Sequence, residues 1–187
     1  MSAPVDSEFL ADPADLAALT GLSPEDPRLR AALLAASRRF AGAVRHPVRL
    51  VEADETVLDG NGTTTLTLPA APVTAVSRVE LAGVALTPDE FAWSADGLLE
   101  RDSGWPRARR NVRVIWSHGY DPVPGMVSDA VVTAAHIALN TEPGLSTLSV
   151  GGMSVSYATR FGGATSGATE TWTAAVDAYR LNRGERP

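Results

Sequence analysis

The stretch Asn111–Asn140, NVRVIWSHGYDPVPGMVSDAVVTAAHIALN, decides the fold because its pattern changes from that of a strand to that of a helix. Apolar and polar residues alternate around Val112, Val114 and Trp116, with the period of two that is typical of a half-buried strand. The residues that follow Pro124 are compatible with a helix and nearly uncharged. The stretch therefore predicts a strand, a corner and a helix over 125–140, whose shared face is Val127, Val131, Ala134, Ala135 and Ala138.

The corner is the segment His118-Gly119-Tyr120-Asp121-Pro122. Glycine permits unusual backbone angles, and proline removes a backbone donor, so neither strand nor helix continues through it. A site built on His118 and Asp121 is one interpretation of this segment. The other is purely architectural: the corner aims the helix that follows, and we prefer it because no further catalytic group accompanies the pair.

Two helices are predicted before the strand region, after a loose end over residues 1–11. Asp12-Pro13-Ala14-Asp15 supplies an N-cap and a proline at the first helical position, and Gly21 can end this short helix. A second N-cap followed by proline occurs at Ser23-Pro24-Glu25-Asp26. It should begin a longer helix that ends at His46-Pro47. Its apolar stripe is Leu29, Leu33, Ala36, Phe40 and Ala43.

Residues 47–117 carry the signals of strands. Asp59-Gly60-Asn61-Gly62 and Asp96-Gly97 read as hairpin turns, and Gly83 marks another turn. About six short strands at this spacing predict an antiparallel β unit.

The segment 141–168 is rich in Gly, Ser and Thr, and only Glu142 and Arg160 in it are charged. Val150–Tyr157 could form a strand or hairpin, and a loop of this length is usually functional or disordered. We regard it as a candidate flexible arm, with the residues Gly151, Gly152, Met153 and Tyr157.

A last helix is expected within 169–187, with Thr169 as its cap and Gly184 as its end. Trp172, Ala175, Val176 and Tyr179 fall on one face of it. The sequence thus predicts an α+β fold, in which a helical core contains an inserted antiparallel β unit. The expected parts are 1–46 (acidic segment and helices), 47–117 (β unit), 118–140 (core helix), 141–168 (loop or hairpin) and 169–187 (helix and tail).

Composition excludes several classes of protein. The chain has 187 residues, 44% hydrophobic residues and no cysteine, so it can bury a core but has neither disulfide nor thiolate chemistry. No apolar run is long enough for a membrane span, and the acidic N-terminus does not look like a signal peptide, so we expect a product made in the cytoplasm. The net charge of −6 arises in residues 1–27, which leaves a near-neutral body that is unsuited to dedicated nucleic-acid binding.

The sequence contains no recognisable motif for catalysis or cofactor binding. His46, His118 and His136 lack the spacing of a zinc site. Asp59–Thr63 begins like a calcium loop but lacks its glycine and closing glutamate, with Thr64 and Ala70 in their places. Nucleophile elbows and glycine-rich phosphate loops are missing from the sequence as well. We therefore expect no catalytic residue, no metal and no cofactor.

Two groups of residues are candidates for contacts with other proteins. The dense basic cluster is a solvated surface in one interpretation and a subunit contact in another, in which it pairs with acidic residues such as Asp12 and Asp15. Its members are Arg107, Arg109, Arg110 and Arg113. Direct DNA binding comes third, because no aromatic platform accompanies the arginines. The last helix can either pack on its own core or dock into the groove of a partner. The candidate docking residues are Trp172, Val176, Tyr179, Arg180 and Arg183.

In chain order, these features resemble the head-to-tail connector (adaptor) proteins of long-tailed bacteriophages. The resemblance covers residues 24–180 and depends on an ordered series of segments rather than on one motif. The segments are Leu66–Val73, Val76–Gly83, Leu86–Trp93, Gly97–Arg101, Ile115–Tyr120 with Pro124 and the helix after it, and Val150–Tyr157. The β unit between the long helix and 125–140 departs from the smallest, all-helical members.

The resemblance implies a non-enzymatic virion protein at the neck between head and tail. Such adaptors form a ring, typically of twelve copies, beneath the portal, and they carry a stopper or tail-completion protein. Double-stranded DNA passes through the ring without sequence recognition. An alternative from another class is a small, non-viral ligand- or protein-binding β module, which predicts an apolar cleft near Trp93, Trp105 and Trp116.

Overall fold

The computed structural model has an α+β fold and describes residues 8–140, 147–150, 153–156 and 170–181. The chain divides into two compact units. One unit comprises Met1–Val44 and Gly125–Tyr179, and the other comprises Arg45–Pro124 and Arg180–Pro187. The β strands of the second unit thus interrupt the sequence of the helical unit, and the chain returns to the helical unit between Pro124 and Gly125.

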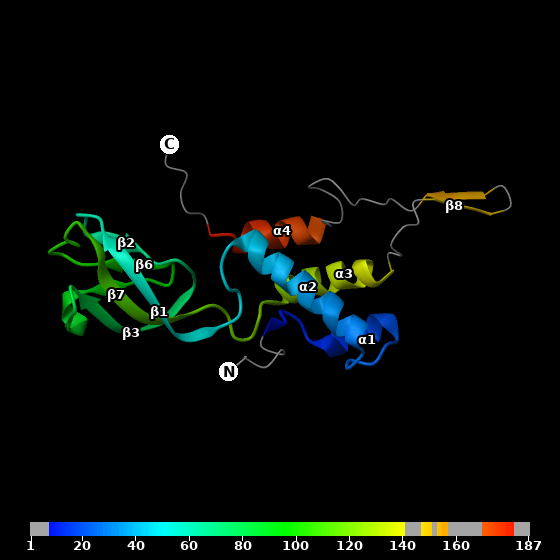
Figure 1. Ribbon diagram of the computed structural model, residues 1–187, viewed down its shortest axis with the longest axis horizontal. Helices are drawn as coiled ribbons and strands as arrows, with labels where there is room; N and C mark the ends of the chain where they lie inside the picture. The colour runs from blue at the N-terminus through cyan, green and yellow to red at the C-terminus, as the bar shows by residue number, and fades with distance from the viewer. Residues whose placement is uncertain (1–7, 141–146, 151–152, 157–169, 182–187) are drawn as a thin grey trace. The chain divides into compact units, whose positions relative to one another are not determined.

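The helical unit contains α1 (Pro13–Thr20), α2 (Pro27–Val44), α3 (Gly125–Asn140) and α4 (Glu170–Tyr179). Helix α2 contacts the other three helices, and α3 contacts α1 and α4 (Figure 1). The predicted apolar stripe of α2 is buried except at Ala43, because Val44 fills the next core position instead. The buried residues of α3 are Val127, Ala130, Val131, Val132 and Ala135, so the expected face is shifted away from Ala134 and Ala138.

Both N-terminal helices begin with a capped Asp-Pro pair. The side chain of Asp12 accepts a hydrogen bond from the backbone N–H of Ala14 at 2.8 Å, and Gly21 ends α1 in the left-handed conformation, as predicted. Helix α2 begins at Pro27 and not at Ser23-Pro24, so that prediction was wrong. Asp26 caps it by accepting from the Arg28 N–H at 2.8 Å, and this bond holds the pKa of Asp26 below its ordinary value.

The segment just before α1 is packed against the helical unit, which corrects the expectation of a loose end for its described part. Phe9, Leu10 and Ala11 are buried, and the Leu10 N–H donates to Ser37 Oγ at 3.1 Å. Apolar side chains at three consecutive positions carry no period, so the sequence pattern could not reveal that they are buried.

The expected C-terminal helix forms, but it ends at Tyr179 rather than near Gly184. Ala175 is fully buried, and the ring of Trp172 meets that of Phe40 in α2 edge-on. Of the two alternatives for this helix, packing on its own core therefore holds for these two side chains. Thr169 and Gly184 lie outside the described residues.

The β unit consists of two antiparallel sheets. The four-stranded sheet has the order β1-β7-β3-β4, and the three-stranded sheet has the order β2-β6-β5. The strands are β1 (Val51–Gly60), β2 (Thr65–Thr67), β3 (Val73–Leu81), β4 (Val84–Ala85), β5 (Ala92–Trp93), β6 (Leu98–Glu100) and β7 (Ala108–His118). The core of this unit is formed by residues of both sheets and the loops between them: Leu66, Leu68, Ala70, Val73, Val79, Leu99, Trp105, Val112, Val114 and Trp116.

Two of the predicted turns form hairpins. Ala82 and Gly83 both have positive φ (50° and 83°) and connect β3 to β4, as a two-residue primed turn requires. Gly97 has a φ of 84°, and its N–H donates to the Ser94 carbonyl at 3.0 Å between β5 and β6.

The hairpin predicted at Asp59–Gly62 is wrong. β1 pairs with β7 and β2 pairs with β6, so the two strands around this turn belong to different sheets. The Gly60 N–H donates to Asn111 Oδ1 at 2.7 Å, and the Gly62 N–H donates to the Trp105 carbonyl at 2.8 Å. These tertiary bonds replace the cross-strand bonds of a hairpin.

A hairpin does form in the segment between α3 and α4. β8 (Thr147–Val150) pairs with β9 (Met153–Ser156), and Val150 is opposite Met153. A hairpin was one of the two forms expected for Val150–Tyr157, but the observed one begins earlier: β9 lies within that segment, whereas β8 shares only Val150 with it. Of the residues proposed as a flexible arm, Met153 begins β9, and Gly151, Gly152 and Tyr157 lie outside the described residues.

Candidate functional site

The arginine cluster lies at the beginning of β7. Arg107, Arg109 and Arg110 are exposed, and their side chains make no ion pair within the part of the chain that the structure describes. Arg110 has a φ of 51°, and its backbone N–H donates to Asp59 Oδ1 at 2.6 Å. The backbone of the cluster is thus fixed to the end of β1 while three cationic side chains remain free to meet a partner.

Arg113 belongs to a different group of charges. Its guanidinium lies 3.3 Å from Glu55 in β1 and 3.9 Å from Glu80 in β3. Arg78 also reaches Glu80, at 2.7 Å. These ion pairs join β1, β7 and β3 across the four-stranded sheet. The Arg113–Glu55 pair is about half exposed on both partners and therefore contributes little stability. The structure therefore separates Arg113 from the three arginines with which the sequence grouped it.

The acidic residues expected to complement the cluster are on α1. Asp12 is exposed and occupied as the N-cap, whereas Asp15 is exposed in the first helical turn. A carboxylate at this position is favoured by the helix dipole.

His118 and Asp54 form a pair that the sequence did not indicate. His118 is 1% exposed at the end of β7, and its Nε2 lies 3.1 Å from Asp54 Oδ2. A bulge brings the carboxylate there, because the β1–β7 register shifts between Val51 and Asp54, where Ala53 has a φ of 50°. The ring of Trp116 is stacked on the imidazole with centroids 4.2 Å apart. A charged residue 64 positions away carries no periodic signal, so no pattern could have predicted this pair.

The corner after His118 has the geometry of a structural junction. Gly119 has a φ of 98°, and a side chain there would collide with the backbone of Arg49. The Tyr120 N–H donates to the Val48 carbonyl at 2.8 Å, and the Leu50 N–H donates to the Tyr120 carbonyl at 2.9 Å. Asp121 is exposed, and His118 bonds to Asp54 instead, so these described residues do not assemble the alternative site at His118 and Asp121.

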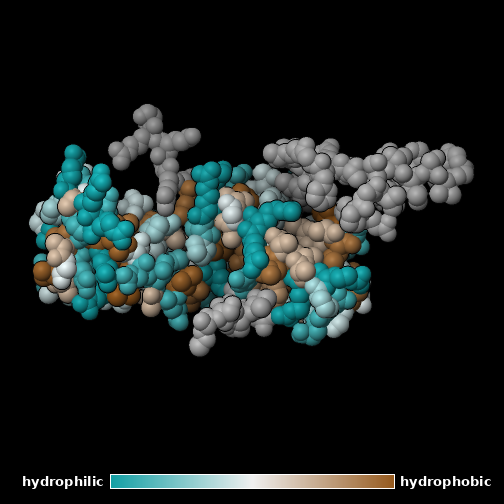
Figure 2. Space-filling model, viewed as in Figure 1, coloured by the Kyte–Doolittle hydropathy of each residue, from teal (hydrophilic) through white to brown (hydrophobic). Residues whose placement is uncertain are grey.

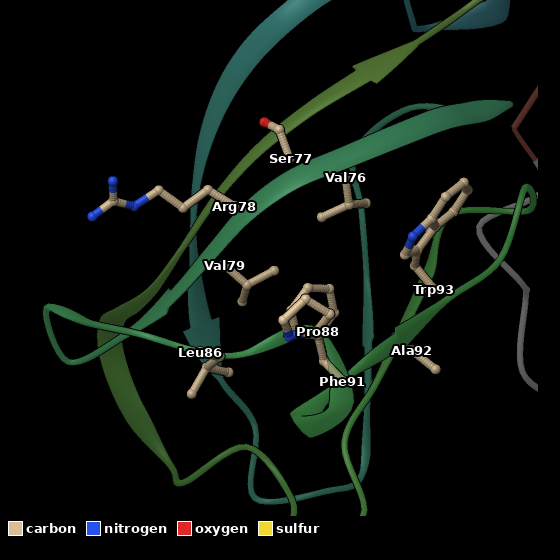
Figure 3. Close-up of a pocket in the computed structure, with 9 residues that line it drawn as sticks. All are labelled: Val76, Ser77, Arg78, Val79, Leu86, Pro88, Phe91, Ala92 and Trp93. Carbon is tan, nitrogen blue, oxygen red and sulfur yellow. The ribbon is translucent and has the colours of Figure 1, made fainter.

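A pocket of about 370 Å³ lies between β3 and the segment formed by the short helix η2 (Pro88–Glu90) and β5. In Figure 3 the side chains of Val79, Pro88 and Phe91 gather in it, with the Trp93 indole beside Val76, whereas Arg78 points away. Trp105 and Trp116 are buried in the core, so the cleft expected near three tryptophans involves only Trp93, which is 41% exposed. The lining residues are Val76, Ser77, Arg78, Val79, Leu86, Pro88, Phe91, Ala92 and Trp93.

The remaining histidines have local roles. His46 is buried beside the Pro47 carbonyl, with Nδ1 at 2.9 Å from the oxygen, and His136 lies 2.9 Å from Asn140 Nδ2. Among residues 8–140 and the later described segments, no three His, Asp or Glu side chains form a group that could hold a metal ion. In the same part of the chain, no helix has the length and apolar character needed to cross a membrane.

The candidate docking residues of α4 differ in exposure. Trp172, Val176 and Tyr179 are half-buried, and Arg180 is exposed directly after the helix. Arg183 lies outside the described residues. On the face shown in Figure 2, hydrophilic and hydrophobic residues are intermixed over both units. The large apolar side chains that are exposed are scattered: Leu19, Val84, Trp93, Met126 and Ile137.

No family model and no curated protein match this chain. Solved structures do match it in fold. A chain in the "neck of native GTA particle computed with C12 symmetry" has a TM-score of 0.63 and 16% identity, covering 100% of this chain and 97% of that chain. The "neck of empty GTA particle computed with C6 symmetry" gives a TM-score of 0.61 and 17% identity, covering 100% of this chain and 97% of that chain.

A third match lies in the "virion of native gene transfer agent (GTA) particle", with a TM-score of 0.62 and 16% identity. It covers 98% of this chain and 94% of the matched chain. At these identities the likeness establishes a shared fold, and it extends over both units and nearly the full length of each chain.

Proposed function

We propose that this chain is a structural protein of a phage-like particle, a head-to-tail adaptor at the neck. The observation that carries the proposal is the shared fold with chains from the neck of gene transfer agent particles, over 100% of this chain and 97% of the matched chain. A match of one unit alone would support only a common module. A match that includes both the helical unit and its inserted β unit supports a common architecture and, with it, a common place in the particle.

In this proposal twelve copies form a ring beneath the portal, and the ring lines part of the channel for double-stranded DNA. The C12 symmetry with which one matched neck was computed supports that copy number. A closed ring needs heterologous contacts, in which two different surfaces of one chain meet. Such a pair of opposite charge is offered by the exposed Arg107, Arg109 and Arg110 of the β unit and the exposed Asp15 of the helical unit.

The portal contact in this proposal uses α4 and the residues after it. Trp172 packs on Phe40, so it positions the helix within its own unit. The half-buried Val176 and Tyr179 and the exposed Arg180 are the described candidates for the portal contact, and Arg183 is a candidate from the sequence alone. A stopper or tail-completion protein is the partner on the tail side. Synthesis in the host cytoplasm and residence in the virion follow from the same proposal.

The experiment is cryo-electron microscopy of the particles whose genome encodes this chain. The proposal expects density for the described fold in a ring at the neck, next to the portal. Particles whose neck is complete and contains no copy of this chain would contradict it. A parallel assay mixes the purified chain with purified portal rings, with no binding as the contrary outcome.

One observation favours a second candidate function, a ligand-binding β module. The pocket beside Trp93 is partly open and mostly apolar in its side chains. Since Trp93 is the exposed indole among those of the described residues, its fluorescence should report ligand entry. A Trp93→Phe variant identifies its signal, and unchanged fluorescence of the parent chain across a panel of small apolar ligands would contradict this candidate.

A further inference from the structure

Strand β1 is the long edge strand of the four-stranded sheet. It has ten residues, and within the described chain only one strand, β7, pairs with it. The register with β7 is continuous over Asp54–Leu58, which leaves a straight run of backbone along the outer side. The opposite edge of the same sheet is shorter, because β4 contains only Val84–Ala85. An open edge of this kind is a template for an added strand.

The composition of β1 limits which strand can be added. Its sequence VEADETVLDG contains four acidic residues: Glu52, Asp54, Glu55 and Asp59. Symmetric pairing of β1 with β1 from a second copy would bring these carboxylates close together, and like charges on facing strands are destabilising. Acidic side chains are a common protection of edges against such pairing. An uncharged or basic strand meets no such repulsion.

The β8–β9 hairpin is suited to the open edge of β1, because it lacks a third strand among the described residues and its sequence is uncharged. It consists of two strands of four residues each, and within the described residues no third strand joins them. An isolated two-stranded hairpin is marginally stable in water and gains stability when a third strand is added. Its segment, Thr147–Ser156, contains no charged residue.

The hairpin strands and the regular part of the β1 edge also have similar lengths. Four residues of a hairpin strand fit within the five-residue run Asp54–Leu58. The chain between α3 and β8 is residues 141–146, which can span about 20 Å, and residues 157–169 before α4 can span about 43 Å.

We propose that the outer edge of β1 accepts the β8–β9 hairpin of a second copy of this chain as an added strand. The contact joins two different surfaces, an acidic edge and a neutral hairpin, so it is heterologous and can repeat from copy to copy around a ring. The inference rests on the proposed ring and assigns it a backbone contact between subunits. Backbone hydrogen bonds hold the added strand on β1. The carboxylates of β1 disfavour the competing contact, in which β1 pairs with β1 of a second copy.

The first test is chemical cross-linking of the full chain, which has no cysteine of its own. Two single variants, Thr56→Cys in β1 and Ser154→Cys in β9, are mixed and treated with a short bis-maleimide. The matched control replaces the β1 variant by Ala18→Cys on the exposed side of α1. We expect the β1 mixture to give at least about fivefold more cross-linked heterodimer, since the contact raises the effective concentration. Equal yields in the two mixtures overturn the proposal.

The second test uses the sign of the charge. Ser149→Glu places an acid next to the acidic edge, and Ser149→Lys places a base there; Ser149→Gln is the neutral control. The Glu variant should weaken association about two- to fivefold and the Lys variant should strengthen it by a similar factor. Glu55→Lys should reverse both effects. Ala18→Lys reports the effect of net charge alone. Effects of equal sign for Glu and Lys, or no reversal, contradict the proposed contact.

The outcomes separate this inference from the proposed function. A ring at the neck without preferential cross-linking means that the ring exists and uses other contacts. Preferential cross-linking without any copy at the neck means that the hairpin contact exists in an assembly other than an adaptor. Circular dichroism at the helical wavelengths checks that each variant retains its helical unit.

Discussion

The ring of Trp172 meets the ring of Phe40 edge-on, with centroids 5.2 Å apart and an interplanar angle of 84°. This contact joins α4 to α2, which lie near opposite ends of the sequence, and Ala175 is fully buried one turn further along α4. The C-terminal helix is therefore part of the helical unit. A truncation that tests portal binding should begin after Tyr179, because removal of the whole helix would also remove part of the core.

Trp172→Ala should lower the free energy of unfolding by about 2 kcal/mol, since it removes a half-buried indole and its aromatic contact. Urea denaturation measures the change. Thr173→Ala, at an exposed position of the same helix, serves as the control and should change stability little. Equal stability of the Trp172→Ala variant and the parent would mean that α4 does not contribute to the core.

Gly60→Ala and Gly42→Ala should have opposite effects. A side chain at Gly60 would collide with the Pro106 carbonyl and Asn111, so we expect a loss of about 3 kcal/mol. Gly42 is in α2 with open space around it, so alanine there should add about 0.5–1 kcal/mol through helix propensity. Thermal denaturation of the two variants provides the comparison. A tolerated Gly60→Ala would show that the β1–β2 connection can move away from residues 105–111.

Asp54→Ala should cost about 1 kcal/mol, because it leaves Nε2 of the buried His118 without its partner. In a His118→Phe background the same change should cost much less. The difference between the two backgrounds is the coupling energy of the pair, obtained from urea unfolding of the four proteins. Additive effects would mean that the 3.1 Å contact contributes no stability.

Because of the N-cap of α2, the free energy of unfolding should decrease as the pH falls into the acidic range. The hydrogen bond from the Arg28 N–H holds the pKa of Asp26 below its ordinary value. A lowered pKa means that the folded state favours the carboxylate, so this contribution is complete above the unfolded pKa and is lost as the pH falls through the folded one. Asp26→Asn keeps a capping oxygen and should be less sensitive to pH below about 4. Melting temperatures at pH 2.5 to 6 compare the two, and parallel curves would contradict the assignment.

Replacing Arg107, Arg109 and Arg110 together by Glu should weaken association between copies while the fold is retained. The three side chains are exposed and make no ion pair in the described part of the chain, so their loss removes no internal contact. Sedimentation at two salt concentrations measures association. The parent should weaken with salt, because attraction between exposed charges is screened. Unchanged association and an unchanged salt response would remove the cluster from the interface.

Much of the fold could be predicted from local signals. The Asp12 cap, the end of α1 at Gly21, the turns at Gly83 and Gly97 and the helix over 125–140 all depend on neighbouring residues, and the structure contains each of them. The turn at Asp59–Gly62 had an equally strong local signal, yet it forms no hairpin. Its backbone groups bond to residues 105 and 111, which are remote in the sequence.

In the candidate site, too, local signals predicted some features, whereas contacts between remote residues determined the others. The arginine-rich segment was visible as a cluster, but only the structure separates Arg113, which pairs with Glu55 and Glu80, from the other three arginines, which form no ion pair with any described residue. The pair of His118 and Asp54 had no signal at all, because a bulge and a cross-strand register bring the two residues together.

The stretch Asn111–Asn140 by itself determined that a strand turns through a corner into a helix, because alternation, glycine and proline act within a few residues. Only the tertiary structure decided that this strand is paired on both sides, with β1 on one side and β3 on the other, while no strand of the described residues pairs with the outer edge of β1. Strand order depends on which distant segments bury apolar surface together. Local pattern cannot encode that choice, since it carries no information about the partner of a strand.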